Sequence, residues 1–422
     1  MPTPSLLIVP SRFKSGKLYS QIPTSGAGDF TVTRATAATR VNASGFIESV
    51  ASGIPRLDYF ASGGTVGCPA LLVEPSGSNL ALQSSDYSLT WISSQLNSTS
   101  GVTSPSGTND ATLFEATVNT ARLRQTITLT SGTTYTFSLF GKFGSLSSGF
   151  TMNVFDENAI TYGSGVCQAF NLNEGTLGAS GTVGAGFTLQ SVGMENYGNG
   201  WYRCRMTVLM GYTPTTPRVG MRVGTQITSG RPLSVVSGTV NVWGAQLETG
   251  SVATSYIPTT TGSVTRNAEV VSVTGAVSGS IGQTEGVLYI EVQSDLLDDD
   301  IIFINRVTGA GSNSVNIVKN SSNQVRGRIT YNNTNITFNT SAAVTGMAKI
   351  AIAYKSGDSS MYVNGISAGT SATAFAFTGA LNSITINKSA AVLFGVRPNS
   401  IRAVALYNTR LTNAQLAALT TP

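Results

Sequence analysis

The sequence predicts an all-β protein made of tandem antiparallel β-sandwiches, a jelly roll followed by a second sandwich, preceded by an irregular N-terminal module. Glycine supplies 46 of the 422 residues, and serine and threonine are abundant, a composition that suits short strands joined by many turns. Short stretches of alternating apolar and polar residues recur at fairly even spacing, and glycine-containing turns separate them. Sustained helical periodicity is nearly absent, so a helical fold is excluded.

Residues 1–83 are the first of three predicted units. Its strand-like pieces are Ser5–Val9, Phe30–Thr33 and Leu71–Val73, and connections rich in Gly, Ser and Pro separate them. This pattern is too irregular for a self-sufficient core. We therefore expect the segment to dock on another surface, either the next domain of the same chain or a neighbouring subunit.

The second predicted unit, residues 84–262, has the strand rhythm of a jelly roll. Thr130-Ser131-Gly132-Thr133 is one of its turns, and the alternation from Tyr135 to Phe140 gives the unit an apolar face. The predicted strands are Ala121–Leu129, Thr134–Lys142, Thr151–Asp156, Cys167–Leu172, Trp201–Leu209, Val219–Val223 and Gly238–Gln246.

The third predicted unit, residues 263–422, is a second sandwich that ends in a short helix. Asn364-Gly365 is a strong hairpin-turn signal, and Thr412-Asn413-Ala414-Gln415 is a capping box that opens a helix over Gln415–Leu419. The predicted strands are Val287–Val292, Asp300–Asn305, Ser314–Val318, Gln324–Tyr331, Ile336–Asn339, Ala348–Lys355, Ser359–Val363 and Arg402–Tyr407.

Charge is sparse and scattered, which argues against nucleic acid as a partner. Charged residues make up 11% of the chain and the net charge is +5. Arg122 and Arg124 share one face of a predicted strand, where we expect them to face solvent, and no basic stripe follows a phosphate backbone. No stretch approaches the roughly 20 apolar residues of a membrane span, and the N-terminus does not resemble a signal peptide.

The residue types present exclude most enzymatic chemistry. The chain has no histidine, which removes Ser-His and Cys-His mechanisms, and Cys68, Cys167 and Cys204 form neither a disulfide framework nor a zinc knuckle. A glycosidase needs only two facing carboxylates, so it is the one enzymatic alternative. Neighbouring carboxylates in a strand point to opposite faces, so we assign no catalytic residue and predict a protein that is not an enzyme. The carboxylates considered for such a pair are Asp156, Glu157 and Glu195 in the second unit and Asp295, Asp298, Asp299 and Asp300 in the third.

No metal site or cofactor is predicted, with one alternative. The Asp295–Asp300 loop offers clustered oxygen ligands of the kind that calcium prefers, but its spacing matches no EF-hand loop.

Sugar recognition normally uses an exposed aromatic ring beside polar groups, and the sequence does not single out one such site. Trp201 and Trp243 lie in strand patterns and are predicted to pack in a core or between domains. The aromatic residues considered as platforms are Tyr87, Trp91, Tyr197, Trp201, Tyr331 and Tyr354. Arg34, Arg40 and Arg266 are expected to be structural and to bond carbonyl groups or carboxylates such as Asp29 and Asp58.

Three segments resemble bacteriophage virion proteins. The series Pro4–Pro10, Asp29–Asn42, Ile54–Tyr59 and Leu71–Leu80 looks like the opening module of tail or head fibre proteins. The Gln246–Arg266 seam, QLETGSVATSYIPTTTGSVTR, resembles the junction that closes a carbohydrate-binding-module-like jelly roll. The last unit, with its closing Ile401–Thr412 segment and final helix, resembles a concanavalin A-like or laminin-G-like lectin sandwich.

The resemblance implies a structural virion protein, a fibre or spike subunit made in the host cytoplasm and assembled with capsid, portal or tail proteins. Its fibres would be homotrimers that adhere to host-surface glycans. Two alternatives stay open: a polysaccharide-cleaving tailspike, and a purely structural capsid decoration protein.

Overall fold

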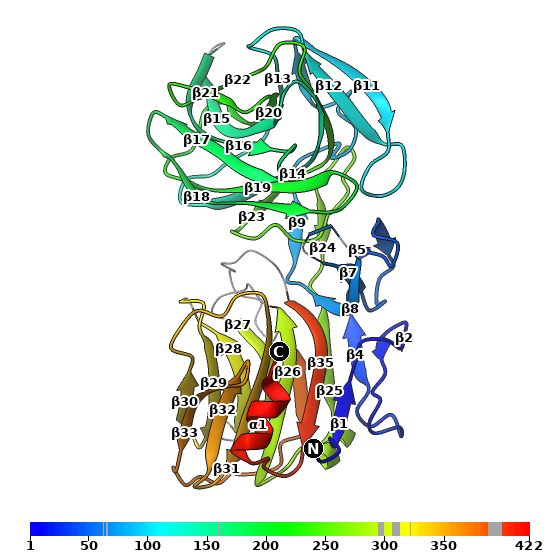
Figure 1. Ribbon diagram of the computed structural model, residues 1–422, viewed down its shortest axis with the longest axis vertical. Coiled ribbons are helices and arrows are strands. Elements are labelled where there is room, and N and C mark those ends of the chain that lie inside the picture. Colours follow the sequence, from blue (N-terminus) through cyan, green and yellow to red (C-terminus); the bar gives the residue numbers. More distant parts are fainter. Residues whose placement is uncertain are drawn as a thin grey trace.

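The computed structural model describes residues 1–61, 63–64, 66–158, 161–293, 299–305, 313–320, 322–386 and 399–422. The protein is all-β, and two β-sandwiches are stacked along its long axis (Figure 1). We call them the distal sandwich, residues 84–262, and the basal sandwich, residues 1–76 together with 267–422. Both chain termini lie in the basal sandwich (Figure 1).

The distal sandwich consists of two six-stranded antiparallel sheets packed face to face. The first sheet runs β10 (Ile92–Ser94), β13 (Arg122–Thr126), β20 (Pro217–Val223), β15 (Gly149–Asn158), β16 (Thr161–Asn171), β17 (Thr176–Val183). The second sheet runs β11 (Leu96–Val102), β12 (Ala111–Ala116), β23 (Thr239–Thr249), β14 (Thr134–Ser145), β19 (Trp201–Met210), β18 (Phe187–Asn196). A separate hairpin, β21 (Gln226–Thr228) and β22 (Arg231–Leu233), lies at the far end of the molecule (Figure 1).

The basal sandwich has an eight-stranded and a nine-stranded sheet. The eight-stranded sheet runs β33 (Ile366–Ser371), β32 (Ser359–Val363), β31 (Met347–Lys355), β26 (Glu285–Gln293), β35 (Asn399–Tyr407), β8 (Val66–Val73), β7 (Leu57–Phe60), with β1 (Leu6–Ile8) also on β35. The nine-stranded sheet runs β2 (Phe13–Lys14), β3 (Lys17–Leu18), β4 (Phe30–Thr33), β25 (Val270–Thr274), β34 (Ser383–Ile386), β27 (Asp299–Asn305), β28 (Ser314–Lys319), β29 (Val325–Tyr331), β30 (Thr334–Asn339). A 3₁₀ turn, Ala276–Ser280, follows β25.

The N-terminal arm, residues 1–76, supplies strands to both sheets of the basal sandwich. Leu6 pairs with Leu406, Leu71 pairs with Ile401, and β4 pairs with β25. The arm therefore docks on the last unit of the same chain, and not on the next domain or a neighbouring subunit as expected, because its strands complete both sheets of that unit. A role of residues 1–83 in attachment to a particle stays a prediction.

Two strands connect the sandwiches. β9 (Gly77–Asn79) runs out of the basal sandwich and β24 (Val264–Arg266) runs back, and the two form an antiparallel pair in which Asn79 is opposite Val264. The distal sandwich is thus inserted between two halves of the basal one. A second small pair, β5 (Ala38–Val41) and β6 (Ile47–Val50), lies beside this connection (Figure 1).

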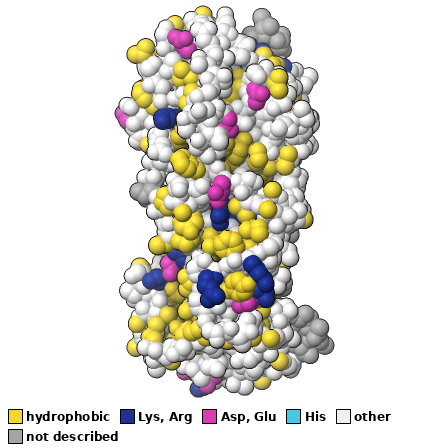
Figure 2. Space-filling view, turned by 90° about the vertical axis from the view of Figure 1, so that its right-hand side faces the viewer, with side chains coloured by type: hydrophobic (Ala, Val, Ile, Leu, Met, Phe, Trp, Pro, Cys, Tyr) yellow, Lys and Arg dark blue, Asp and Glu magenta, His cyan; other side chains and the backbone are white. Residues whose placement is uncertain are grey.

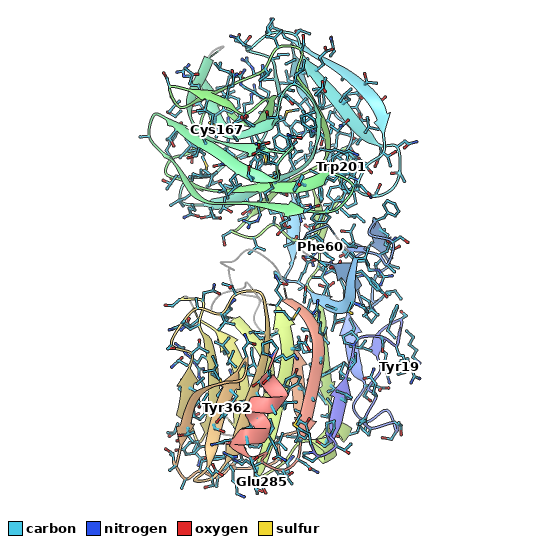
Figure 3. The ribbon with its side chains drawn as sticks, in the orientation of Figure 1. Tyr19, Phe60, Cys167, Trp201, Glu285 and Tyr362 are labelled. Carbon is cyan, nitrogen blue, oxygen red and sulfur yellow. The ribbon has the colours of Figure 1, made fainter. Side chains whose placement is uncertain are left out.

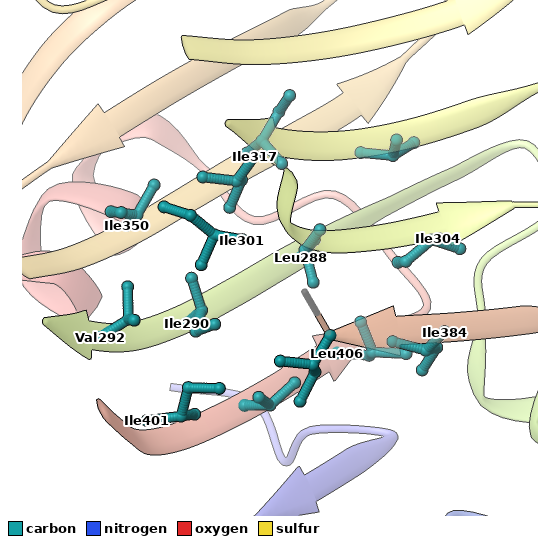
Figure 4. Close-up of a cluster of buried hydrophobic side chains, with 14 of the residues drawn as sticks. Leu288, Ile290, Val292, Ile301, Ile304, Ile317, Ile350, Ile384, Ile401 and Leu406 are labelled. Atoms are coloured by element: carbon teal, nitrogen blue, oxygen red, sulfur yellow. The ribbon is translucent and has the colours of Figure 1, made fainter. Parts of the chain in front are cut away.

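Aliphatic side chains from both halves of the basal sandwich fill its core. Figure 4 shows part of this cluster, which includes Leu288 and Leu406 of the eight-stranded sheet and Ile304 and Ile384 of the nine-stranded sheet. Leu6, Phe30 and Leu71 of the N-terminal arm belong to the same buried cluster and are at most 1% exposed. The arm therefore contributes to the core as well as to the sheets.

The local signals near the C-terminus are confirmed. Val363 and Ile366 are opposite partners, and both Asn364 and Gly365 have positive φ, as a two-residue hairpin turn needs. The helix α1 spans Asn413–Thr420 and begins with the predicted capping box, in which Thr412 and Gln415 bond each other's backbone N–H. Its Leu416 packs on the outer face of the eight-stranded sheet.

Candidate functional site

The candidate site is a groove of about 1010 Å³ at one side of the distal sandwich. β10 is the edge strand of one sheet and β11 is the edge strand of the other, and both contribute residues to the groove. Its walls come from the Ser85–Ser93 segment, from the β11–β12 hairpin, and from Asn109 and Asp110 before β12. A volume of this size matches ordinary small-ligand sites.

Aromatic side chains form the floor of the groove. Tyr87 contacts Trp91 and Phe114 edge-on, with ring centroids 5.3 and 5.6 Å apart. Trp91 Nε1 donates to the carbonyl of Leu82 at 3.0 Å, and burial raises the pKa of the Tyr87 hydroxyl well above its usual value. These three rings are nearly buried, so the apolar surface open to a ligand comes from Ile92 and half-buried Leu96. The floor is rigid, and its rim is partly apolar.

Hydroxyls and two carboxylates form the walls. Asp86 Oδ1 accepts hydrogen bonds from the Ser88 hydroxyl and N–H, and those bonds lower the pKa of Asp86. Asp110 Oδ1 accepts from Thr108. Both carboxylates are exposed, and within the described part of the chain only their Oδ1 atoms accept hydrogen bonds. The serine and threonine residues that line the walls are Ser85, Ser88, Ser93, Ser98, Ser100 and Thr112.

No Lys or Arg is among the described residues that line the groove. A site with carboxylate acceptors, hydroxyls and a partly apolar rim suits a neutral, hydroxyl-rich ligand, because ligand hydroxyls donate to the carboxylates and C–H groups pack on the apolar rim. An anionic ligand would meet two like charges without compensation.

The six aromatic residues considered as platforms have different environments. Tyr87 and Trp91 form the groove floor, Tyr354 is 1% exposed in the basal core, and half-buried Tyr331 stacks against Phe375. Trp201, together with Trp243, packs between the sandwiches as predicted. Figure 3 shows Phe60 of the arm and Trp201 of the distal sandwich at this junction. Tyr197 lies there too, 4.6 Å from Phe60 between ring centroids.

The three carboxylates of the distal sandwich that were considered for a catalytic pair, Asp156, Glu157 and Glu195, have separate structural environments. Asp156 accepts from the N–H groups of Thr215 and Thr216, whereas Glu157 pairs with arginines on the outer sheet face. Glu195 lines a crevice of about 50 Å³ at the junction, which has room for a few water molecules only. The Asp295–Asp300 loop lies outside the described residues except for Asp299 and Asp300, whose backbone begins β27.

A buried charge network holds the junction. Arg56, which is fully buried, lies 2.7 Å from both Glu74 and Glu269. Arg34 pairs with Glu269 at 3.0 Å, and Arg266 lies 3.5 Å from each carboxylate. We call these five residues the seam network. These three guanidiniums and two carboxylates, which have almost no exposure, come from the arm and from β24 with the residues that follow it.

The seam network also reaches the distal sandwich. Glu74 accepts from the N–H of Ser255 at 2.8 Å and from its hydroxyl at 2.6 Å. Burial acts to raise the pKa of Glu74, but the charges of Arg266 and Arg56 outweigh it and lower that pKa to about 2. The structural role predicted for Arg34 and Arg266 is confirmed. Their carboxylate partners are Glu74 and Glu269, which were not predicted from the sequence.

The predicted carboxylate partners have other roles. Asp29 accepts from the Ser20 N–H and hydroxyl, and Asp58 accepts from the N–H of Val41. Arg40 pairs with Glu48 at 2.8 Å. A signal for the missed partners does exist: Glu74 is a single charge directly after the apolar run Leu71–Val73, and Glu269 follows Arg266 by three residues.

Other site types receive no support from the described residues. They contain no group of three or more His, Cys, Asp or Glu side chains that is arranged to hold a metal ion. None of the helices within them is long and apolar enough to cross a membrane. Cys68 is an exposed free thiol, and Cys167 and Cys204 are buried free thiols.

Comparison with known proteins finds similarity to solved structures at low sequence identity and low TM-score. No protein-family model and no curated protein sequence matches the chain. A Ruminococcus gnavus IT-sialidase CBM40 bound to α2,3-sialyllactose is 18% identical, with 33% of this chain and 84% of that chain covered and a TM-score of 0.28. A heptameric SAP-like pentraxin from Limulus polyphemus is 13% identical, with 32% and 68% covered and a TM-score of 0.25.

A third solved structure, the binding domain of botulinum neurotoxin DC in complex with rat synaptotagmin II, is 17% identical. The match covers 36% of this chain and 40% of that one, with a TM-score of 0.28. Likeness at this level carries no argument about ligands. The all-β fold predicted from the sequence is confirmed by the observed antiparallel sheets themselves.

Proposed function

We propose that the protein is a non-enzymatic glycan-binding protein of a bacteriophage virion, a fibre or spike subunit that binds neutral host-surface glycans through the groove of the distal sandwich. The groove carries the glycan part of this proposal, because it combines a suitable volume, hydroxyl-lined walls, two exposed carboxylates and an apolar rim. The virion part rests on the resemblance of the N-terminal series and the Gln246–Arg266 seam.

The arrangement of the two sandwiches supports an adhesive role. The groove lies in the sandwich that is farther from both termini (Figure 1), and the seam network fixes that sandwich to the basal one. Figure 2 shows that Lys, Arg, Asp and Glu are sparse on the upper part of the face that carries β11 and β12, whereas Lys and Arg gather lower down, over the arm. A neutral polar surface of this kind suits a fibre subunit packed beside others, and we propose a homotrimer attached to capsid, portal or tail proteins.

Glycan binding is tested with the purified full-length protein and a panel of immobilised neutral and acidic oligosaccharides. Asp110→Asn removes a charged acceptor in the groove, and Glu174→Gln is the matched control, since Glu174 is exposed on the same sandwich outside the groove. We expect retention on at least one neutral glycan, and a loss of about tenfold or more in affinity for Asp110→Asn with Glu174→Gln unchanged. Equal retention of all three proteins would contradict the groove as the site.

The same experiment distinguishes binding from cleavage when polymer length is followed alongside retention. The two groove carboxylates lie on the same side of the sandwich. A glycosidase also needs a general acid with a raised pKa, and hydrogen bonds from Ser88 instead lower the pKa of Asp86. We therefore expect intact polymer. Shortening that Asp86→Asn abolishes would favour the tailspike alternative, and the absence of both retention and shortening would favour a capsid decoration protein.

A further inference from the structure

A cluster of three arginines lies on the outer face of the distal sandwich, separate from the groove. Arg122 and Arg124 alternate along β13 with core Leu123, and Arg218 precedes core Val219 on the neighbouring strand β20. Glu157, at the end of β15, lies between them. We call these four residues the arginine cluster. Its strands belong to the sheet at the end of the molecule farthest from the basal sandwich (Figure 1).

One carboxylate serves all three guanidiniums. Glu157 lies 3.2 Å from Arg122, 3.3 Å from Arg124 and 2.9 Å from Arg218. The cluster therefore carries two positive charges in excess, in a chain whose charged residues make up only 11%. The prediction that Arg122 and Arg124 share a face is confirmed, but they are half-buried rather than fully solvated.

Most N–H donors of the cluster have no hydrogen-bond acceptor among the described residues. A guanidinium has five N–H donors. Arg122 and Arg218 each donate to Glu157, and Arg124 donates to the Ser94 hydroxyl at 3.1 Å. The Nε atom of Arg122 is buried and makes no hydrogen bond within the described part of the chain, whereas Nε of Arg124 lies 3.3 Å from an oxygen of Glu157. A buried donor without an acceptor costs free energy, so this face gains stability from any acceptor that reaches it.

The electrostatic environment points the same way. Burial, and then the charge of Arg122, lower the pKa of Arg124, with Glu157 acting in the opposite direction. Arg222, on the same strand as Arg218, differs because it donates to the carbonyl of Thr120 at 2.7 Å and is thus part of the framework. Side-chain exposures of 21%, 13% and 13% leave Arg122, Arg124 and Arg218 within reach of a ligand.

We propose that the arginine cluster binds an oxyanion group, a carboxylate or a sulfate, of an acidic polysaccharide. Planar guanidiniums present paired donors that match such oxygens, and two excess charges offset the charge of the ligand. This site does not depend on the groove, whose chemistry suits neutral sugars. The protein would then recognise two chemically different saccharides with one sandwich.

The test measures the affinity of the full-length protein for polygalacturonate, dextran sulfate and unmodified dextran, with inorganic sulfate as a competitor. Arg124→Gln and Arg218→Gln each remove one guanidinium, and we expect losses of about tenfold, the equivalent of about 1.4 kcal/mol. Glu157→Gln removes the internal competitor and is expected to raise affinity severalfold, which a merely structural cluster would not do. Arg231→Gln, an exposed arginine of the same sandwich, is the control for net charge.

Thermal unfolding of each variant separates loss of binding from loss of folding, and Glu157→Gln and Arg218→Gln keep the test informative if Arg124→Gln unfolds. Preferential binding of a charged polymer over dextran, weakened by the arginine variants alone, would support the proposal. Three results would overturn it: equal binding of all polymers, equal affinity of Arg218→Gln and Arg231→Gln, or binding of inorganic sulfate without binding of either charged polymer.

Discussion

The two sandwiches differ in how the chain builds them. The distal sandwich is formed by one continuous segment, and its two sheets close on strands of the same 84–262 range. The basal sandwich needs two segments separated by that whole insertion, because Leu6 pairs with Leu406 and Leu71 pairs with Ile401. The irregular opening of the chain is therefore part of a core, and stability of the basal sandwich depends on contacts of very long sequence separation.

The largest expected effect on stability comes from deleting the N-terminal arm, compared with deleting the distal sandwich. Deletion of residues 1–76 removes core side chains such as Leu6, Phe30 and Leu71, each worth roughly 1.5–3 kcal/mol, and should leave a basal sandwich without cooperative unfolding. Replacement of residues 80–263 by Asn-Gly joins two opposite partners, Asn79 and Val264, through a hairpin turn, and should leave the basal sandwich folded. Thermal unfolding followed by circular dichroism checks both. If both truncated proteins unfold in the same way, the basal sandwich does not depend more on the arm than on the distal sandwich.

The second prediction concerns the seam network. Glu269→Gln leaves Arg34, Arg56 and Arg266 buried with only Glu74 as a counter-charge, and should lower the free energy of unfolding by about 3–5 kcal/mol. Glu48→Gln is the matched control, since its pair with Arg40 is partly exposed and should contribute at most about 1 kcal/mol. Urea unfolding measures both. Equal costs would mean that burial does not distinguish the two pairs.

The third prediction uses two buried carboxylates whose pKa values shift in opposite directions. The pKa of Glu74 is lowered from 4.5 to about 2, so its contribution to stability is present above pH 4.5 and is lost as the pH falls toward 2. The pKa of Glu248 is raised, chiefly by burial and against the hydrogen bonds of Thr254 and Gln246, so its ionisation lowers stability at neutral pH.

Urea midpoints as a function of pH separate these two effects. Glu248→Gln should be more stable than the wild type at about pH 7, and the difference should shrink as the pH falls through the raised pKa of Glu248. Glu74→Gln should be less stable at that pH, with a difference that shrinks below pH 4.5. Parallel pH profiles for the two variants would contradict the assignment of opposite shifts.

The smallest expected effect is at the helix that covers the basal sandwich. Thr412→Ala removes the side chain that accepts from the N–H of Gln415 and should cost about 1 kcal/mol. Thr409→Ala, at an exposed position just before the helix, is the control. Both are read from the same urea curves, and a cost for Thr409→Ala as large as that for Thr412→Ala would show that the cap is not the cause.

Local sequence patterns predicted the strands in which apolar and polar residues alternate. β14, β19 and β20 and the Asn364-Gly365 hairpin were found because apolar residues or turn residues mark them directly. β17, with the sequence TLGASGTV, was missed because it is mostly exposed and built of small residues. The partner of β1 was not predictable, because no local signal identifies a strand 400 residues away in the chain.

The candidate site shows the same limit. Tyr87 and Trp91 were among the residues considered, but the sequence placed them on an exposed platform and the structure places them at the bottom of a groove with 5% exposure each. Asp86 and Asp110 were not considered, since serine-rich loops of this kind recur throughout the chain. Only the approach of the two edge strands brings these residues together.

The paired connection of β9 and β24 has a mechanical consequence. A pull on the distal sandwich reaches the basal one through two backbone segments at once, so each carries part of the tension. Both termini lie in the basal sandwich (Figure 1), so that tension never passes along a single extended strand between the two bodies. We expect a sideways force on the distal sandwich to tilt it relative to the basal sandwich before either sandwich unfolds.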